Sequence, residues 1–384
     1  MDSLNKFAGM RLAAIKAKGL YRRTIPTTRS DGGKNEREGK SYISFSGNDY
    51  LGLSRNKDVI AAANAATEKF GTGAGASRLV TGDHPLYTEL EAKIAAFKQA
   101  EAVCVFGSGY LTNLGVIPSL VDEGDLIIAD RLCHACIFAG SSLSKASLKV
   151  FRHNDLDHLR DILETYRPKA RHALILTDGI FSMDGDRAPV EAIASLAREF
   201  DAWLMTDDAH GLGVVEDGKG TSFRGAHKLD VPLQMGTLSK AVGAYGGYIA
   251  ADKQVIDLIK NTARALIFTT GLPPGTVAAA LKGMEIIEAD KKLCAKPLQK
   301  AALFCQELGL PAPVTSIVPI ILGEPEAAVR ASGVLADEGF LVMPIRLPTV
   351  PDGTARLRFA FKAVHKDADI KKLVHVLKKE GIVK

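Results

Sequence analysis

The sequence lacks several features that would point to a specialised class of protein. Its formal net charge is only +5 over 384 residues and its basic residues do not cluster, so nucleic acid is not an expected partner. Its 5 cysteines are an odd number in a long chain, which argues against a disulfide framework and for a reducing compartment. Internal repeats and low-complexity tracts are also missing.

Long apolar runs are missing as well. The longest uncharged stretch, residues 102–121, contains three glycines and Pro118, which is typical of a buried strand, loop and helix rather than of a membrane span. Residues 1–6 lack the apolar run of a signal peptide. We therefore expect a cytoplasmic protein that has no contact with a membrane.

What is present is an ordinary globular composition, with 46% hydrophobic and 24% charged residues, which excludes a disordered chain and a collagen. At ~150 residues per domain, the length predicts two or three domains. The pattern along the chain divides into an N-terminal helix with its connecting segment (1–44), a large domain (45–280) and a smaller C-terminal α+β domain (281–384).

Short apolar segments alternate with helical patterns through the large domain. The predicted strands are 43–45, 102–106, 126–129, 148–151, 173–177, 203–206 and 231–235, and the predicted helices include 59–70, 86–97 and 190–200. This alternation predicts an α/β fold, in which helices flank both faces of a mostly parallel sheet and ligands bind at the carboxyl ends of the strands.

The two ends of the chain have different patterns. Near the N-terminus, four apolar residues between Leu4 and Ile15 share one face of a predicted helix that ends at Gly19, and residues 27–40 predict a loop or hairpin. Near the C-terminus, a long charged helix is predicted over 281–308. The further predicted elements are strands at 317–322, 341–343 and 357–361, a helix through Val334 and a last helix from Asp367.

The strongest chemical feature follows the strand predicted at 203–206. That apolar segment ends in Asp207, Asp208 and His210. A single acid at a strand end is usually solvated, but two acids and an imidazole directly after a buried strand favour a place in the ligand crevice. We expect these groups to face that crevice.

A second feature lies about thirty residues further on, where Thr237, Ser239 and Lys240 follow the strand predicted at 231–235. A lysine just past a strand is commonly a surface charge. If it is enclosed, its pKa falls, and the neutral amine can form a Schiff base with an aldehyde. An acid, a lysine and phosphate-binding hydroxyl groups are the parts that a pyridoxal phosphate site requires.

Other features carry an alternative interpretation. The turn at 107–110 lies between a strand and a helix and could bind a dinucleotide, with Asp130 about twenty residues downstream, but its third glycine is missing. Cys133 and Cys136 flank His134 without a second cysteine pair, so packed cysteines are favoured over a metal site, and no metal is expected. Arg346, Arg356 and Arg358 could bind a carboxylate ligand. Alternatively, they lie on the solvent-exposed face of a strand.

Together these residues resemble the α-oxoamine synthases, pyridoxal-phosphate enzymes with the aspartate-aminotransferase-like fold type I. Matching segments follow the family's order over nearly the whole chain, at 46–53, 71–82, 130–135, 181–186, 207–211 and 237–240. Several long matches in order are more specific than any single one. The resemblance implies pyridoxal 5'-phosphate as cofactor and a homodimer with active sites at the interface.

The resemblance also implies a role for each matching residue. Lys240 would bind the cofactor's aldehyde, Asp207 would pair with its pyridine nitrogen, and His134 would stack on its ring. His210 and Ser182 would contact the phenolic oxygen. The other implied cofactor contacts are Ser108, Gly109, Tyr110 and Thr237, with Thr269 and Thr270 reaching the phosphate in the neighbouring subunit. The implied substrate contacts are Arg22 (or Arg23), Asn48, His134, Thr349 and Arg358, which would hold the amino-acid carboxylate.

Within the family, residues 346–358 look most like the member that joins L-alanine to a pimeloyl thioester of CoA or acyl carrier protein in biotin synthesis. Leu347, Asp178 and Cys136 depart from that pattern, in which a proline, a glutamate and a serine are common. One alternative is a member that uses glycine and an acetyl thioester. Outside the family, the alternatives are a nucleotide-dependent oxidoreductase and, more weakly, a non-catalytic binding protein.

Overall fold

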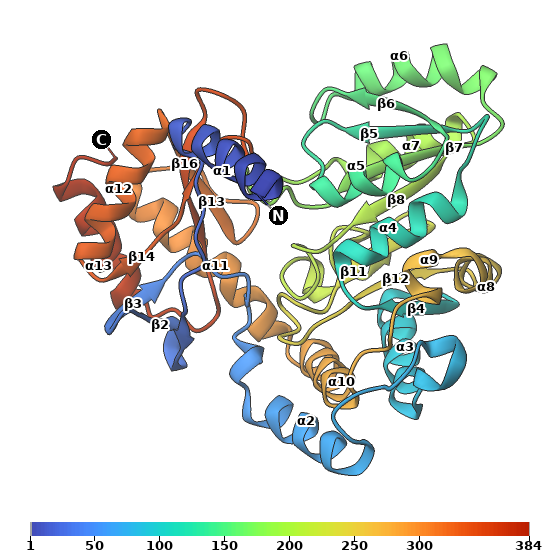
Figure 1. The fold of residues 1–384 in the computed structure, drawn as a ribbon, viewed down its shortest axis with the longest axis horizontal. Coiled ribbons are helices and arrows are strands. Elements are labelled where there is room, and N and C mark those ends of the chain that lie inside the picture. Colours follow the sequence, from blue (N-terminus) through green and yellow to red (C-terminus); the bar gives the residue numbers. More distant parts are fainter. Residues whose placement is uncertain (1, 384) are drawn as a thin grey trace. The chain divides into compact units, whose positions relative to one another are not determined.

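The structure is a computed structural model that describes residues 2–383. The chain forms two compact units, whose elements are coloured in chain order in Figure 1. The larger unit contains residues 47–318 and 360–374, and the smaller one contains residues up to 46, residues 319–359 and residues from 375 on. Among the described residues, no helix is long and apolar enough to cross a membrane.

The larger unit is built on a seven-stranded sheet in the order β4-β12-β11-β8-β7-β5-β6. Only β12 runs against the others, being antiparallel to both of its neighbours. The strands are β4 (Ala102–Phe106), β5 (Leu126–Asp130), β6 (Ser147–Phe151), β7 (Ala173–Asp178), β8 (Trp203–Asp207), β11 (Leu233–Thr237) and β12 (Gly247–Ala251). The predicted α/β fold with a mostly parallel sheet is confirmed.

Helices cover both faces of this sheet. Tyr248 and Ile249, adjacent on β12, point to opposite faces. Tyr248 packs in a core with Leu90 and Met284, and Ile249 packs in another with Ile117. The helices are α2 (Lys57–Phe70), α3 (Pro85–Lys98), α4 (Gly109–Leu120), α5 (Ala135–Ser142), α6 (Leu156–Tyr166), α7 (Val190–Glu199), α8 (Lys253–Thr262), α9 (Arg264–Ile267), α10 (Pro274–Ala289) and α11 (Lys291–Leu308).

The smaller unit contains a four-stranded sheet in the order β1-β2-β3-β14, whose first three strands form the predicted hairpin region. These strands are β1 (Thr28–Arg29), β2 (Lys34–Arg37), β3 (Lys40–Ser44) and β14 (Phe340–Leu341). A second sheet has the order β13-β16-β15, with bounds Ile317–Gly323, Ala355–Ala360 and Pro344–Ile345. The helices are α1 (Asp2–Ala17) and α12 (Pro325–Asp337), and α13 (Asp367–Lys379) contains a boundary between the units.

Two predicted elements differ from the observed ones. The helix predicted over 281–308 is two helices, because Asp290 leaves the helical region (φ −121°, ψ 78°) and its side chain accepts a hydrogen bond from the Leu293 amide, which caps α11. The strand predicted at 231–235 runs from Leu233 to Thr237, since Pro232 has no amide hydrogen to pair.

The compact units also differ from the predicted domain boundaries. Cys294 on α11 is buried in the core of the larger unit, so that helix belongs there rather than to a C-terminal domain. The N-terminal segment joins the strands of 319–359 in one unit. The N-terminal helix exists as predicted, but none of its residues is buried, because no other described element covers its apolar face.

Candidate active site

The acid predicted to pair with a ring nitrogen lies at the carboxyl end of β8. Asp207 is only 5% exposed. Asn113, from α4, donates its side-chain amide hydrogen to Oδ2 of Asp207 at 2.8 Å, and the Ala209 amide donates to Oδ1 at 3.1 Å. These donors stabilise a negative charge in a buried place, and the carboxylate retains lone pairs for a further donor.

Asp208 does not face the crevice, contrary to the expectation for the two acids. It is fully buried and accepts hydrogen bonds from the amide and the hydroxyl of Thr221 at 2.7 and 2.9 Å. Its Oδ2 lies 3.7 Å from the Nζ of Lys98, which is also fully buried. Only one of the two adjacent acids is therefore available to a ligand at the strand end.

Lys240 and His210 lie together beyond the ends of the strands. Lys240 follows β11 by three residues, and its Nζ is 2.7 Å from Nε2 of His210. Nδ1 of the same ring is 2.6 Å from the hydroxyl of Tyr50, which is fully buried. The tyrosine thus fixes the imidazole, and the imidazole fixes the position of the amine.

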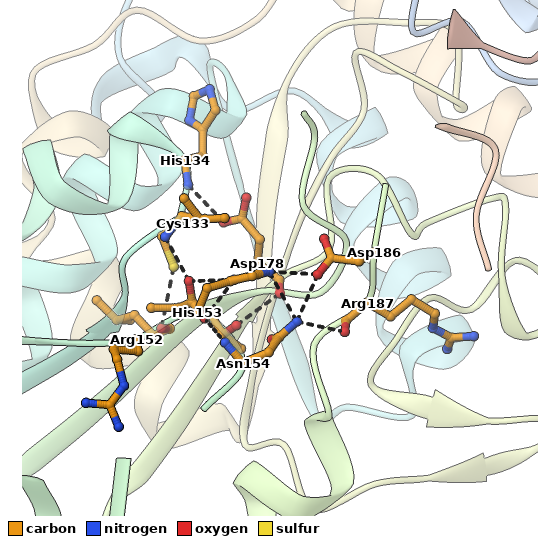
Figure 2. Close-up of polar contacts among 12 residues, drawn as sticks. Cys133, His134, Arg152, His153, Asn154, Asp178, Asp186 and Arg187 are labelled. Carbon is orange, nitrogen blue, oxygen red and sulfur yellow. Dashed lines mark hydrogen bonds and ion pairs between the residues drawn. The ribbon is translucent and has the colours of Figure 1, made fainter. Parts of the chain in front are cut away.

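His134 begins α5 beside the same strand ends. Its amide donates to Oδ1 of Asp178 at 3.2 Å (Figure 2), and its Nδ1 is 2.8 Å from Sγ of Cys136. Partial burial lowers the pKa of His134, and the nearby Lys240 amine lowers it further, against the opposing effect of Asp207. A neutral imidazole at this position can accept or donate a hydrogen bond without adding charge to the site.

Asn113, Tyr50 and Asp178, to which the sequence analysis assigned no role, hold three of the predicted residues in place. Asp178 ends β7 directly opposite Asp207 on β8. Its burial and the neighbouring Asp207 raise the pKa of Asp178 well above its usual value. The one available signal was that β7, like β8, ends in an acid at the carboxyl edge of the sheet.

Cys136 packs against the site without acting as a reactive thiol. Burial and the nearby Asp207 raise the pKa of Cys136 far above its usual value. Its sulfur accepts a hydrogen bond from Asn113 at 3.0 Å. Among residues 2–383, no group of three or more histidine, cysteine or acidic side chains could hold a metal ion. Cys136 is therefore a packed thiol beside Asn113 in this structure.

The start of α4 lies against the end of β11. The hydroxyl of Ser108 caps the helix by accepting from the Leu111 amide at 3.1 Å. A Cβ built on Gly109 would lie 3.2 Å from Cε of Met235 and 3.3 Å from Cβ of Thr237, so the backbone approaches this strand closely. Backbone amides at a helix start and the hydroxyls of Thr237 and Ser239, 2.8 Å apart, are suitable donors for a phosphate.

The remaining predicted cofactor contacts lie near this helix start or on adjacent loops. Tyr110 is half exposed in the first turn of α4, and Ser182 lies in the turn after β7. A Cβ built on Gly107 would lie 3.8 Å from Thr269 Cγ2, so Thr269 is near the helix start of its own chain. Thr270 is exposed and forms a β-bridge with Ser77.

The predicted substrate contacts are divided between the two units. Asn48 belongs to the larger unit, whereas Arg22, Thr349 and Arg358 belong to the smaller one. Arg22 and Thr349 are exposed, and Arg358 is buried within β16. Within the larger unit the cofactor residues are brought together around the ends of β8 and β11. The substrate roles of Asn48, Arg22, Thr349 and Arg358 all stay predictions.

The donor set of the larger unit fits pyridoxal phosphate. β8 and β11 are adjacent and parallel, with Asp207 opposite Met235, so Thr237 lies two residues further along. At ~3.3 Å per residue, the phosphate donors are about 7 Å beyond the acid along the strand direction. A buried acid, a lysine amine and a phosphate cradle thus occur in the order that a phosphorylated pyridine aldehyde needs.

Comparisons with known proteins agree with this geometry. A model of the aminotransferase class I and II family matches residues 40–377. The 8-amino-7-oxononanoate synthase of Methylobacterium sp. (strain 4-46) is 53% identical over 375 residues, which cover 98% of this chain and 96% of that protein. Serine palmitoyltransferase from S. paucimobilis, solved with PLP and myriocin bound, superposes with a TM-score of 0.92 at 28% identity over 99% of each chain. The 8-amino-7-oxononanoate synthase of Francisella tularensis superposes with a TM-score of 0.76 at 26% identity, covering 89% of this chain and 98% of that one.

Proposed function

We infer the reaction of this chain from the premise that it belongs to the aminotransferase class I and II family. It is a pyridoxal-phosphate-dependent acyltransferase of the α-oxoamine synthase type. Its reaction is that of 8-amino-7-oxononanoate synthase, in which L-alanine condenses with a pimeloyl thioester, carbon dioxide and the thiol leave, and an aminoketone remains. The observation that carries this proposal is the Lys240 amine, held by His210 at the sheet edge where Asp207 is buried.

The residues around the sheet edge divide the chemistry between them. When bound, pyridoxal phosphate supplies an aldehyde that captures an amine and a protonated ring that withdraws electrons from it. Asp207 would hold the proton on the ring nitrogen, because its carboxylate is fixed by Asn113 and the Ala209 amide. Lys240 is the residue that would hold the aldehyde, and its amine would serve as the general base and acid for the proton at the α-carbon of alanine.

The two histidines act on either side of that proton transfer. His210, fixed by Tyr50, accepts from or donates to the Lys240 amine and so orients it. His134 would cover the ring face and donate a hydrogen bond to the acyl oxygen, with its backbone fixed by Asp178. Donors placed where negative charge develops stabilise a transition state by electrostatic preorganisation.

The amino-acid carboxylate and the thioester need separate contacts. We assign the carboxylate to Arg358, because a guanidinium binds a carboxylate through two parallel hydrogen bonds. Arg22, Asn48 and Thr349 are assigned to the thioester side. The thioester carrier is CoA or acyl carrier protein. All five cysteines are free and buried, which supports placing the enzyme in the reducing cytoplasm.

Paired substrate assays test this function. We expect the purified enzyme to release thiol fastest with L-alanine and pimeloyl-CoA, and at least about 100-fold more slowly with glycine and acetyl-CoA, since a site that fits one substrate pair loses binding energy with the other. Thiol release and the aminoketone product are measured for all four combinations of amino acid and thioester.

The four combinations also separate the alternative. Preference for glycine and acetyl-CoA would assign the chain to the 2-amino-3-ketobutyrate CoA ligase reaction instead. A purified protein without a visible cofactor band, and without gain of one on adding pyridoxal phosphate, would contradict the whole assignment. Pimeloyl-acyl carrier protein in place of pimeloyl-CoA then identifies the preferred carrier.

The same proposal includes a homodimer whose partner surface adjoins the site. Leu79, Val80 and Phe268 are exposed apolar side chains, and their segments are joined by the Ser77–Thr270 bridge. This apolar patch adjoins Thr269, which lies near the start of α4. A second copy that covers the patch would place the exposed Thr270 near the partner's phosphate.

Substitution in this patch tests the dimer. Val80 is 73% exposed, so Val80→Asp leaves the fold intact while it places a charge in the proposed interface. We expect a shift from dimer to monomer in size-exclusion chromatography with light scattering, together with loss of turnover by about tenfold or more. Leu258→Asp, on an exposed position of α8, is the control and stays dimeric. A dimeric, fully active Val80→Asp protein would refute this interface.

A further inference from the structure

A histidine outside the site joins an acid at the end of a strand to an acid in a separate turn. His153 lies between β6 and α6. Its Nδ1 is 3.0 and 3.1 Å from the two carboxylate oxygens of Asp130, and its Nε2 is 2.7 Å from Oδ2 of Asp186 (Figure 2). Asn154 reinforces the same two acids, with its amide 2.8 Å from Asp130 Oδ2 and its side chain 2.9 Å from Asp186 Oδ2.

The contacts define the protonation of this ring. An ionised carboxylate only accepts hydrogen bonds, so a ring with carboxylates at both nitrogens must donate from both and is therefore an imidazolium. Burial of the ring opposes the charge, but the hydrogen bonds to Asp130 and Asp186 outweigh it and raise the pKa of His153 to about 9. The cation thus joins two anions at neutral pH.

The first acid controls the segment that leads to His134. Asp130 is fully buried at the end of β5, and its Oδ1 accepts from the Leu132 amide at 2.8 Å. Its carbonyl accepts from the Cys133 amide at 3.1 Å. The next residue is His134, whose amide is held by Asp178. His153 therefore holds the base of the loop that carries the ring-covering histidine.

The second acid controls the turn that carries Ser182. The carbonyl of Asp186 accepts from the Phe181 amide at 3.1 Å, and the carbonyl of Phe181 accepts from the Gly185 amide at 2.9 Å, which closes a turn around Ser182. The His153 ring also packs edge-on against Phe181, with centroids 4.3 Å apart. The imidazole therefore touches both ends of this turn.

We propose that His153 is a positioning residue, which fixes the His134 loop and the Ser182 turn relative to each other by bridging Asp130 and Asp186. This inference rests on the proposed function, because it matters only if His134 and Ser182 contact pyridoxal phosphate. The ring of His153 has hydrogen-bond contacts to Asp130, Asp186 and Asn154, which anchor the two segments. Its effect on the cofactor is therefore transmitted through the two loops.

Two substitutions separate the two halves of the bridge. The side-chain amide of asparagine can occupy the place of Nδ1, so His153→Asn keeps the contact to Asp130 and loses that to Asp186. The longer side chain of glutamine places its amide where Nε2 lies. His153→Gln therefore keeps the contact to Asp186 and loses the contact to Asp130. His158→Asn is the matched control, because His158 lies nearby in the first turn of α6 and its ring, within residues 2–383, is hydrogen-bonded to no acid but accepts from the Arg152 amide at 2.9 Å through Nδ1.

The readouts are the dissociation constant of pyridoxal phosphate from the apoprotein, the circular dichroism of the bound cofactor, and kcat. A misplacement of about 1 Å in positioned groups can lower a reaction rate by about 10²-fold. We expect both His153 variants to raise the dissociation constant by about tenfold or more, to alter the cofactor's dichroism and to lower kcat. His158→Asn leaves all three within about twofold.

The outcomes separate this inference from the function on which it rests. If the wild-type apoprotein does not bind pyridoxal phosphate, the proposed function fails. If it binds the cofactor and both His153 variants bind it equally well with unchanged dichroism and kcat, His153 is only a structural residue, and the inference alone is overturned. Unfolding in denaturant shows whether each variant is folded under the assay conditions.

Discussion

Replacement of Lys240 by alanine is expected to abolish turnover while the protein stays folded and retains its ligands. The amine of Lys240 is assigned both the covalent bond to the aldehyde and the transfer of the α-proton, and a positioned acid–base group alone contributes about 10²- to 10⁴-fold. We therefore expect kcat to fall by about 10³-fold or more in Lys240→Ala. The measurement is single-turnover and steady-state thiol release with saturating alanine and thioester.

Two further observations make this result specific. Borohydride should fix the cofactor covalently to Lys240 in the wild-type protein, as detected by mass spectrometry, and should not fix it in Lys240→Ala. Lys253→Ala is the lysine control, because that side chain is exposed and pairs only with Asp257 on the surface. Near-normal turnover of Lys240→Ala, or borohydride attachment to another lysine, would contradict the assignment of the site.

Much of the site follows from positions along the chain. Asp207 is the last residue of the apolar strand β8. Thr237 is the last residue of β11, and Lys240 follows it by three residues. In the structure β11 is the parallel neighbour of β8. Because the carboxyl ends of parallel strands share an edge, sequence position alone brings these residues to one place. The spacing of apolar residues likewise predicts the strands of the seven-stranded sheet, because strands buried on both faces are continuous apolar runs.

The residues that sequence position could not identify act across large separations in the chain. Asn113 lies 94 residues before the Asp207 that it holds, and Tyr50 lies 160 residues before His210. An asparagine inside an apolar helix and a tyrosine in a loop have no distinctive local pattern. Asp208 shows the opposite failure. Its place directly after a buried strand predicted that it faces the crevice, but it is turned toward Lys98 at the end of α3.

Lys98 and Asp208 form a buried ion pair behind the active-site strand. Both side chains are fully buried, with Nζ and Oδ2 3.7 Å apart. Lys98 also donates to the carbonyl of Lys219, and Thr221 donates twice to Asp208. A Cβ on Gly211 or Gly220 would lie within 2.0 Å of the carboxylate oxygens, so no larger residue could replace these glycines beside the acid.

Removal of one partner should destabilise the protein strongly. Lys98→Met leaves a buried carboxylate without its counter-charge, which typically costs about 3–5 kcal/mol in the free energy of unfolding. The double variant Lys98→Met/Asp208→Asn removes both charges and should recover a large part of that loss. Chemical denaturation at fixed protein and cofactor concentration measures both. The exposed pair Lys253–Asp257 is the control, and Lys253→Met should cost less than about 1 kcal/mol.

The pH dependence of this pair has a definite sign. Burial lowers the pKa of Lys98 to about 8 from the value of 10.5 in the unfolded chain, against the opposing effect of Asp208. Between these values the unfolded chain binds more protons than the folded one, so the free energy of unfolding contributed by Lys98 rises from about pH 8 to about pH 10.5. The difference in this free energy between the wild type and Lys98→Met/Asp208→Asn should therefore move in favour of the wild type over that range. A Lys98→Met protein as stable as Lys253→Met would show that the buried charges do not interact as the structure indicates. The absence of the pH trend would show that burial does not lower the pKa of Lys98.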